Sequence, residues 1–272
     1  MPQTTRLTIL VDNTPGGGCG GEHGFAAHVA TPDGALLFDT GASDLIVRNA
    51  DVLGVDLGRV AAVVLSHGHF DQSGGLDAHI PMLPEDVPVW AAHPAVSGPR
   101  YSIRPAARAR AIGFAAGDAA RSRVRVRQEP LEILPNVWMT GPVPRRNDFE
   151  DAGGPFFLDE AGTTPDTIPD DQSLVIITPS GPVLLAGCAH AGIVNTMDHA
   201  ADILGLRGFR AVIGGLHLVN AGGDRIMRTL GALTARKVET VVPGHCTGPR
   251  ATDLLDAAFH AGTCCSGSVF DL

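Results

Sequence analysis

Short apolar stretches rich in β-branched residues recur along the chain, separated by glycine, proline, aspartate and asparagine. Runs of this length bounded by turn residues are typical of β-strands. The pattern predicts strands at residues 7–11, 25–30, 35–38, 61–65, 89–92, 137–140, 174–178, 183–186, 211–213 and 240–242. Stretches with helical periodicity fall between some of them and predict helices at residues 43–53, 192–204, 224–235 and 252–261. Strands that alternate with helices at both ends of the chain indicate α/β layers.

The middle of the chain, roughly residues 96–170, departs from this pattern. Residues 100–146 hold ten arginines and three acids, a local charge of +7, whereas residues 147–171 hold eight acids and no lysine or arginine, a local charge of −8. One interpretation is a solvated insertion whose two halves pair with each other. The other is a lid that presents arginines to an anionic substrate, because guanidinium groups suit phosphate and carboxylate. We therefore predict one domain over residues 1–272, with an insertion or lid at about 96–170.

Composition excludes several classes of protein. A chain of 272 residues with 44% hydrophobic and 18% charged residues is globular. Its net charge of −9 argues against a nucleic-acid binder, and the single lysine, Lys237, leaves little room for Schiff-base chemistry. No apolar run is long enough to span a membrane, and the first residues lack the pattern of a signal peptide. Five cysteines without a CxxC pair do not suggest a disulfide framework, so we expect a cytoplasmic protein.

Eleven histidines are the most unusual feature, and several follow predicted strands. After the strand at 61–65 the chain places His67, His69 and Asp71 within five residues. Imidazole and carboxylate groups bind zinc and similar divalent metals, and Gly68 gives the loop freedom to turn both rings toward one point. A cluster of this kind at a strand end marks a metal or catalytic site.

Three more histidines repeat this layout. His190, His217 and His245 each follow an apolar strand that ends in small residues. Any one of them alone would be as consistent with a structural histidine as with a ligand. Loops from one sheet edge would bring all of them together, so the recurrence predicts a shared constellation.

These residues carry a resemblance to the metallo-β-lactamase superfamily. The runs that carry it are Leu37-Phe38-Asp39-Thr40-Gly41 and His67-x-His69-x-Asp71 with Gly74-Gly75. Further runs resemble one branch, the 7,8-dihydropterin-6-methyl-4-(β-D-ribofuranosyl)aminobenzene-5′-phosphate synthases: Gly21-Glu22-His23-Gly24-Phe25, Pro144-Arg145-Arg146-Asn147-Asp148-Phe149-Glu150, Asp170-Asp171-Gln172-Ser173-Leu174, Gly187-Cys188-Ala189-His190, Gly214-Gly215-Leu216-His217-Leu218 and His245-Cys246-Thr247-Gly248.

The resemblance implies a four-layer αββα sandwich with two mixed β-sheets and a metal site at one edge. It implies that His67, His69 and His190 form a first metal site, and that Asp71 and His245 belong to a second. Asp39 is expected to orient ligands by hydrogen bonds. Zinc is the expected metal, with manganese or iron as alternatives.

Two departures from the superfamily concern the second site. The residue after the motif aspartate is usually histidine, and here it is Gln72, whose carbonyl oxygen is a weaker zinc ligand. His217 stands in the interval where a bridging aspartate is usual. We therefore expect one firmly bound metal and a weak or altered second site.

Three functions follow from these observations. The first is a metallohydrolase of a small anionic ester or phosphoester, in which Asp71 holds or deprotonates water and His217 is a ligand or an acid. The second is a synthase-type transferase, in which Arg145 and Arg146 hold phosphate. The third is a non-catalytic metal-binding relative. His23 is a candidate for the pocket lining. Gly16-x-Gly18-x-x-Gly21 is not interpreted as a dinucleotide fingerprint, because a strand and not a helix follows it.

Overall fold

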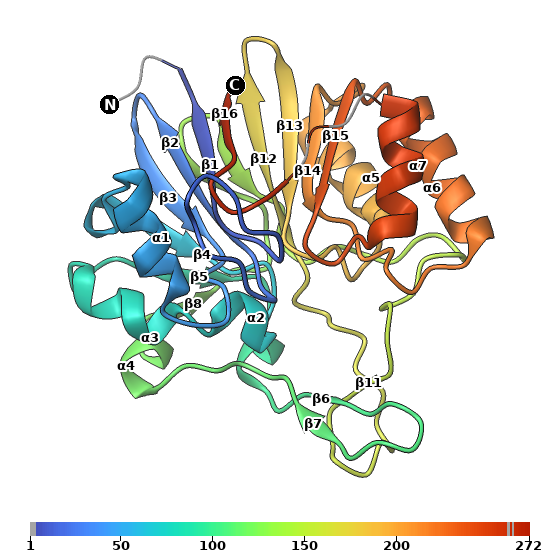
Figure 1. The fold of residues 1–272 in the computed structure, drawn as a ribbon, viewed down its shortest axis with the longest axis horizontal. Coiled ribbons are helices and arrows are strands. Elements are labelled where there is room, and N and C mark those ends of the chain that lie inside the picture. Colours follow the sequence, from blue (N-terminus) through green and yellow to red (C-terminus); the bar gives the residue numbers. More distant parts are fainter. Residues whose placement is uncertain (1–3, 260–261, 263) are drawn as a thin grey trace.

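Two β-sheets lie face to face, and helices cover their outer faces (Figure 1). This computed structural model describes residues 4–259, 262 and 264–272. In that part of the chain, the first sheet has the order β16 (Val269–Asp271), β1 (Arg6–Val11), β2 (Ala26–Thr31), β3 (Gly34–Phe38), β4 (Ala62–Val64), β5 (Val89–Ala91) and β8 (Val124–Val126). The second has the order β15 (Thr240–Gly244), β14 (Ala211–Gly215), β13 (Gly181–Ala186), β12 (Ser173–Thr178), β10 (Val137–Met139) and β9 (Leu131–Leu134).

Both sheets are mixed and pack through alternating apolar positions. In the first sheet β1, β2 and β3 pair antiparallel, whereas β3, β4, β5 and β8 pair parallel. On β3, Leu36 and Phe38 lie in the core between the sheets, and Leu37 faces the helices on the other side. On β12, Leu174 and Ile176 face the inter-sheet core. Successive side chains of a strand point to opposite faces, so each strand contributes to two apolar layers.

Helices complete the outer layers. Helices α1 (Leu45–Leu53), α3 (Leu76–His79) and α4 (Asp118–Arg121) cover the first sheet, and α5 (Ile193–Leu204), α6 (Gly223–Ala235) and α7 (Pro249–Phe259) cover the second. The remaining helical turns are α2 (Phe70–Ser73), η1 (Leu57–Arg59), η2 (Ile80–Met82) and η3 (Pro94–Ser97). The result is the predicted αββα sandwich with two mixed sheets, which is confirmed. In the described part of the chain, no helix is both long and apolar enough to cross a membrane.

All ten predicted strands and four predicted helices have counterparts in the structure. Their ends differ by up to three residues, and positions 260 and 261 of the last predicted helix lie outside the described residues. The sequence pattern missed several short strands. Among them are β8, β9 and β16, which carry exposed polar or charged side chains and therefore lack a clear apolar alternation.

The segment 96–170 is not one continuous insertion as predicted, because its centre enters both large sheets. Strand β8 extends the first sheet, and β9 and β10 extend the second. The projecting part consists of the two flanks, which pair in a small sheet of β11 (Phe156–Phe157), β6 (Tyr101–Ser102) and β7 (Arg110–Ala111). Figure 1 shows this small sheet beyond one end of the sandwich, on the side of α2. We call it the flap sheet.

The basic and acidic halves of this segment pair through Arg100, which is fully buried. Its guanidinium contacts the carboxylates of Asp166 and Asp170. Buried charges need such partners, so this contact holds the two flanks together. The pairing interpretation therefore applies to Arg100. Arg104, Arg108 and Arg110 of the same segment are exposed.

Candidate metal centre

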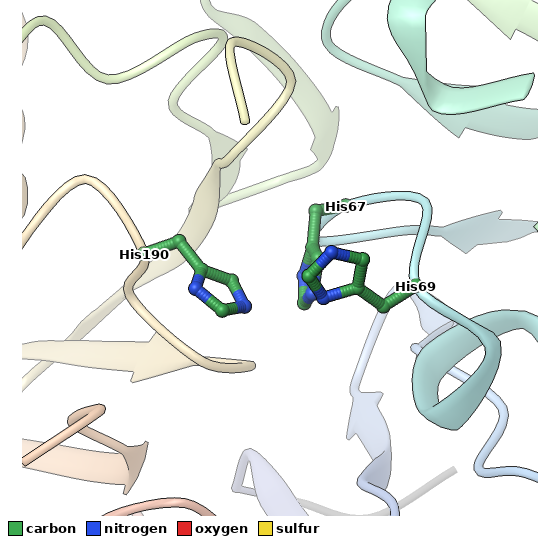
Figure 2. Close-up of side chains that lie close together, drawn as sticks. All are labelled: His67, His69 and His190. Carbon is green, nitrogen blue, oxygen red and sulfur yellow. The ribbon is translucent and has the colours of Figure 1, made fainter. Parts of the chain in front are cut away.

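Three imidazole rings converge at the edge where strands of both sheets end. His67 and His69 follow β4, and His190 follows β13 of the facing sheet. Figure 2 shows His190 opposite the two rings of the other loop. The ring centroids are 4.5 Å apart for His67 and His69, 4.6 Å for His67 and His190, and 4.9 Å for His69 and His190. The sandwich thus supplies one cluster from two halves, which we call the three-histidine cluster.

The chemistry of the three-histidine cluster fits a divalent metal. The Nε2 atom of each ring is buried and has no hydrogen-bond partner in the protein. One ligand atom from each ring lies within 4.8 Å of the others. Burial lowers the pKa of all three histidines, that of His69 to about 3, so the rings are neutral. Buried polar atoms are normally satisfied, and three neutral imidazoles with free Nε2 atoms form a ligand set for zinc and similar metals.

Hydrogen bonds on the opposite ring nitrogens orient two of these rings. The Nδ1 atom of His67 shares a hydrogen bond of 2.9 Å with Ser66 Oγ. The Nδ1–H of His190 donates to the carbonyl oxygen of Ala152 at 2.9 Å. Contacts of this kind fix the tautomer of a ligating histidine and direct Nε2 toward the metal.

The backbone of the His67–His69 loop is held by buried carboxylates. Asp39 Oδ1 accepts the Ser66 N–H at 2.7 Å, and Asp170 Oδ2 accepts the Gly68 N–H at 2.8 Å. A Cβ atom at Gly68 would lie 2.0 Å from the carbonyl oxygen of Val96, so only glycine fits there. Asp39 thus bonds to the backbone of this loop and not to a ring, and its role in orienting ligands stays a prediction.

A second cluster lies beside the first and contains a carboxylate. Asp71 Oδ2 lies 3.3 Å from His23 Nε2 and 3.4 Å from His245 Nε2. Gln72 Nε2 lies 3.1 Å from His245 Nε2. Burial would raise the pKa of Asp71, but the hydrogen bond and charge of His245 and the neighbouring rings hold it below its usual range. Burial would lower the pKa of His245, but Cys246, Asp71 and Asp12 raise it to about 9. We call His23, Asp71 and His245 the carboxylate cluster.

His217, Cys188 and Cys246 lie next to members of the two clusters. The ring of His217 lies 4.2 Å from that of His190, centroid to centroid, and its Nδ1 atom is buried without a partner. Its backbone has φ +46°, an uncommon conformation for a residue with a side chain. Cys188 offers its sulfur within 4.8 Å of ligand atoms of His190 and His217. Cys188 also stands within that distance of His245 and Cys246.

Both clusters open into one cavity of about 620 Å³. Arg104, Arg108 and Arg110 of the flap sheet region also line it. The ring of Phe156 stands over the three-histidine cluster, with its centroid 5.3 Å from that of His69 and 5.4 Å from that of His190. A cavity of this size suits a small molecule, and its walls combine metal-ligating groups with cationic ones.

The structure brings together His67, His69, Asp71, His190, His217 and His245, with His23 and Gln72 beside them. Arg145 and Arg146, predicted to hold phosphate, do not line the cavity. Arg145 donates to the carbonyl oxygens of Thr167 and His190, and Arg146 pairs with Asp202. Three other arginines of the same basic segment, Arg104, Arg108 and Arg110, line the cavity.

Several residues of the candidate site belong to no sequence motif and were not predicted. Phe156, Asn13 and Ser66 act through contacts that only the folded loops create. Cys188 was visible beside His190, but free cysteine usually behaves as a small hydrophobic residue, so its position at the metal centre had no separate signal.

Comparison with known proteins places this geometry in a family. The model of the metallo-β-lactamase superfamily matches residues 20–245. A 7,8-dihydropterin-6-methyl-4-(β-D-ribofuranosyl)-aminobenzene-5′-phosphate synthase of Methanocaldococcus jannaschii is 28% identical over 239 residues, which cover 82% of this chain and 79% of that protein. An uncharacterised protein of the same organism is 27% identical over 253 residues, or 90% of this chain and 91% of that protein.

Comparison with solved structures leads to the same fold. The crystal structure of Tm1679, described as a metal-dependent hydrolase of the β-lactamase superfamily, superimposes with a TM-score of 0.83 at 31% identity and covers 98% of this chain and 99% of that one. Zinc-bound PqqB from Methylobacterium extorquens gives a TM-score of 0.57 at 14% identity, over 98% of this chain and all of that one, which is a likeness of fold.

Proposed function

Because the chain belongs to the metallo-β-lactamase superfamily, whose relatives described above include enzymes, we propose that it is a metal-dependent hydrolase of a small anionic ester or phosphoester. One observation carries the proposal. Three buried imidazole nitrogens without partners lie together, and two of their rings, those of His69 and His190, line the same cavity as three arginines. The first group suits a metal and the second suits an anion.

The metal would be held by His67, His69 and His190, and when bound it supplies Lewis-acid polarisation and lowers the pKa of water. Asp71 is the base of the proposed reaction, because its carboxylate is ionised and lines the same cavity. His217 lies on the other side of His190 and is placed to give a proton to the leaving group. Phe156 and the flap sheet limit the access of water to these groups.

The arginines set the substrate class. Arg104, Arg108 and Arg110 bring three positive charges to the mouth of a cavity in a chain whose net charge is −9. Guanidinium groups bind phosphate and carboxylate in a planar, two-point geometry. We propose that they hold the anionic part of the substrate while the ester bond faces the three-histidine cluster.

Metal analysis joined to a hydrolysis assay tests this function. In the double variant His67→Ala/His69→Ala, we expect the first metal equivalent and turnover of phosphoesters, lactones and carboxylic esters to be lost together. His199→Gln, a change outside the cavity, serves as the control. Unchanged metal content and turnover in the double variant would contradict the proposal, as would a metal-loaded wild type that hydrolyses no member of the panel. The same analysis identifies the metal, which we expect to be zinc, with manganese or iron as alternatives.

A second candidate is a synthase-type transferase. The observation that favours it is the 28% identity, over 82% of this chain, to a protein described as a dihydropterin–aminobenzene phosphate synthase. In that case the same arginines would hold a phosphate, and the reaction would join two substrates. Incubating the metal-loaded protein with a dihydropterin diphosphate, with and without the aminobenzene ribosyl phosphate, separates the two candidates. A coupled product supports the transferase, and release of phosphate or diphosphate without coupling supports the hydrolase.

A further inference from the structure

The residue at position 72 is a glutamine, so the ring nitrogen that the superfamily resemblance expects there is missing. We propose that His23, from the loop before β2, replaces it and forms a second metal site with Asp71 and His245. This site shares its cavity with the proposed function and rests on it for its role in catalysis, but binding of the metal is a separate property.

Distances within the carboxylate cluster match a tetrahedral zinc site. In a tetrahedron the distance between two ligand atoms is about 1.6 times the metal–ligand bond, so bonds of about 2.0–2.1 Å give edges of about 3.3–3.4 Å. Asp71 Oδ2 lies 3.3 Å from His23 Nε2 and 3.4 Å from His245 Nε2. The three ligand atoms all lie within 4.8 Å of one another. Two of the three separations thus match those of zinc ligands before any rearrangement.

Asn13 orients both rings of the site. Its Oδ1 atom accepts the Nδ1–H of His245 at 2.9 Å, and its Nδ2 atom lies 3.5 Å from His23 Nδ1. Both rings therefore turn their Nδ1 atoms toward Asn13 and their Nε2 atoms toward Asp71. One amide shared by two ligating histidines is the outer contact expected of a metal site.

Gln72 provides a further donor at the edge of the site. Its Oε1 atom is buried and has no hydrogen-bond partner, while its Nε2 atom points at His245 Nε2 and at Cys188 Sγ, at 3.1 and 3.4 Å. A half-turn of the amide exchanges the two atoms and places the oxygen at the site. Amide oxygen is a weaker zinc ligand than imidazole, so His23 is the residue on which the second site depends.

Sulfur is the competing donor for the same position. Cys188, His245 and Cys246 also offer atoms within 4.8 Å of one another. Cys246 donates to the Cys188 carbonyl oxygen at 3.6 Å, and Cys188 Sγ accepts from Gln72 Nε2 in the present orientation of the amide. Cobalt distinguishes the two ligand sets, since a sulfur ligand gives an intense sulfur-to-cobalt charge-transfer band and a set of nitrogen and oxygen ligands does not.

The experiment is a zinc titration of the metal-free full chain, followed by calorimetry and repeated with cobalt. We expect the wild type to bind two equivalents and His23→Ala to bind only the first tightly, with the affinity for the second reduced by more than the roughly 10–100-fold that loss of an outer contact costs. Adding Gln72→His to His23→Ala should restore the second equivalent, because a ring nitrogen returns to the site. His199→Gln is the control, and circular dichroism confirms that each variant is folded.

Retention of two tight equivalents in His23→Ala would overturn the proposal, and so would a sulfur-to-cobalt band for the second equivalent or failure of Gln72→His to restore it. Each of these three results leaves the proposed hydrolase intact if the first equivalent still supports turnover. Conversely, a wild type that binds two equivalents and loses one in His23→Ala, but hydrolyses nothing, would support the second site and contradict the proposed function.

Discussion

The three-histidine cluster and the carboxylate cluster share one cavity but differ in how they are built. The first consists of neutral, buried rings, two of them fixed by hydrogen bonds on Nδ1. The second contains an ionised carboxylate and a ring, His23, whose side chain is 60% exposed. The three neutral rings carry no charge, and their buried nitrogens lack partners, so a bound divalent cation is expected to stabilise this cluster most. In the carboxylate cluster Asp71 and His245 are buried and His23 is exposed, so the ring of His23 is the member that can adjust its position.

The largest effects are expected when each cluster loses a residue that contacts its rings through their Nδ1 atoms. We expect Ser66→Ala to weaken the first metal equivalent by roughly 10–100-fold and to leave the second unchanged, because the Ser66 hydroxyl shares a hydrogen bond with the ring of His67, a member of the three-histidine cluster. Asn13→Ala should do the reverse, since Asn13 contacts His23 and His245. Zinc titration measures both. Equal weakening of both equivalents by either variant would show that the clusters act as one site.

A buried histidine outside both clusters shows what burial alone does. Burial lowers the pKa of His28 on β2 from its ordinary value of 6.5 to about 4. The charge of Asp56 raises this pKa, and that of His79 lowers it further. The unfolded chain therefore takes up the proton first, and the stability that neutral His28 contributes is present above pH 6.5 and is lost as the pH falls toward 4.

At pH 5 we expect this loss to reach about 2 kcal/mol. Urea unfolding of the wild type and of His28→Gln at pH 7 and pH 5 measures it, and the variant should lose less stability between the two values by that amount. A variant with the same loss as the wild type would show that His28 does not titrate in this range. The remaining loss then belongs to the other buried histidines, including those of the three-histidine cluster.

The smallest expected effect is on KM and concerns the arginines. The sequence predicted Arg145 and Arg146 as the anion-binding residues, whereas Arg104, Arg108 and Arg110 line the cavity. We expect Arg110→Met to raise KM for an anionic substrate about tenfold with little change in kcat, because a charge-assisted hydrogen bond at a partly exposed position contributes modestly. Arg146→Met, the matched change outside the cavity, should leave KM unchanged. Steady-state kinetics checks both, and a larger effect of Arg146→Met would return the anion site to the residues predicted from the sequence.

Much of the fold was predictable because its strands are buried on both faces or alternate cleanly. Strands such as β12 and β13 are continuous apolar runs, and His190, a predicted ligand, comes shortly after β13. Strand β8 was not predictable in this way, because Arg125 lies between its two valines and its burial is incomplete. The division of the segment 96–170 between three sheets follows from long-range pairing, which leaves no local pattern.

In the candidate site, residues at strand ends were predictable and residues on loops were not. His190, His217 and His245 could be grouped because parallel strands β13, β14 and β15 bring their carboxyl ends to one edge. The position of His23 depends on the conformation of its loop and on the contact with Asn13, and both arise only when the chain folds. Arg145 and Arg146 had the right charge, but their partners, backbone carbonyls and Asp202, lie in other segments of the chain.

The three-histidine cluster takes its rings from both halves of the sandwich. His67 and His69 follow a strand of the first sheet and His190 follows a strand of the second, so the spacing of the rings depends on how the two sheets are aligned. The inter-sheet core, to which Phe38 of the first sheet and Leu185 of the second belong, sets that alignment. A repacking of this core that moved one sheet over the other would therefore change the geometry of the site as well as the stability of the fold.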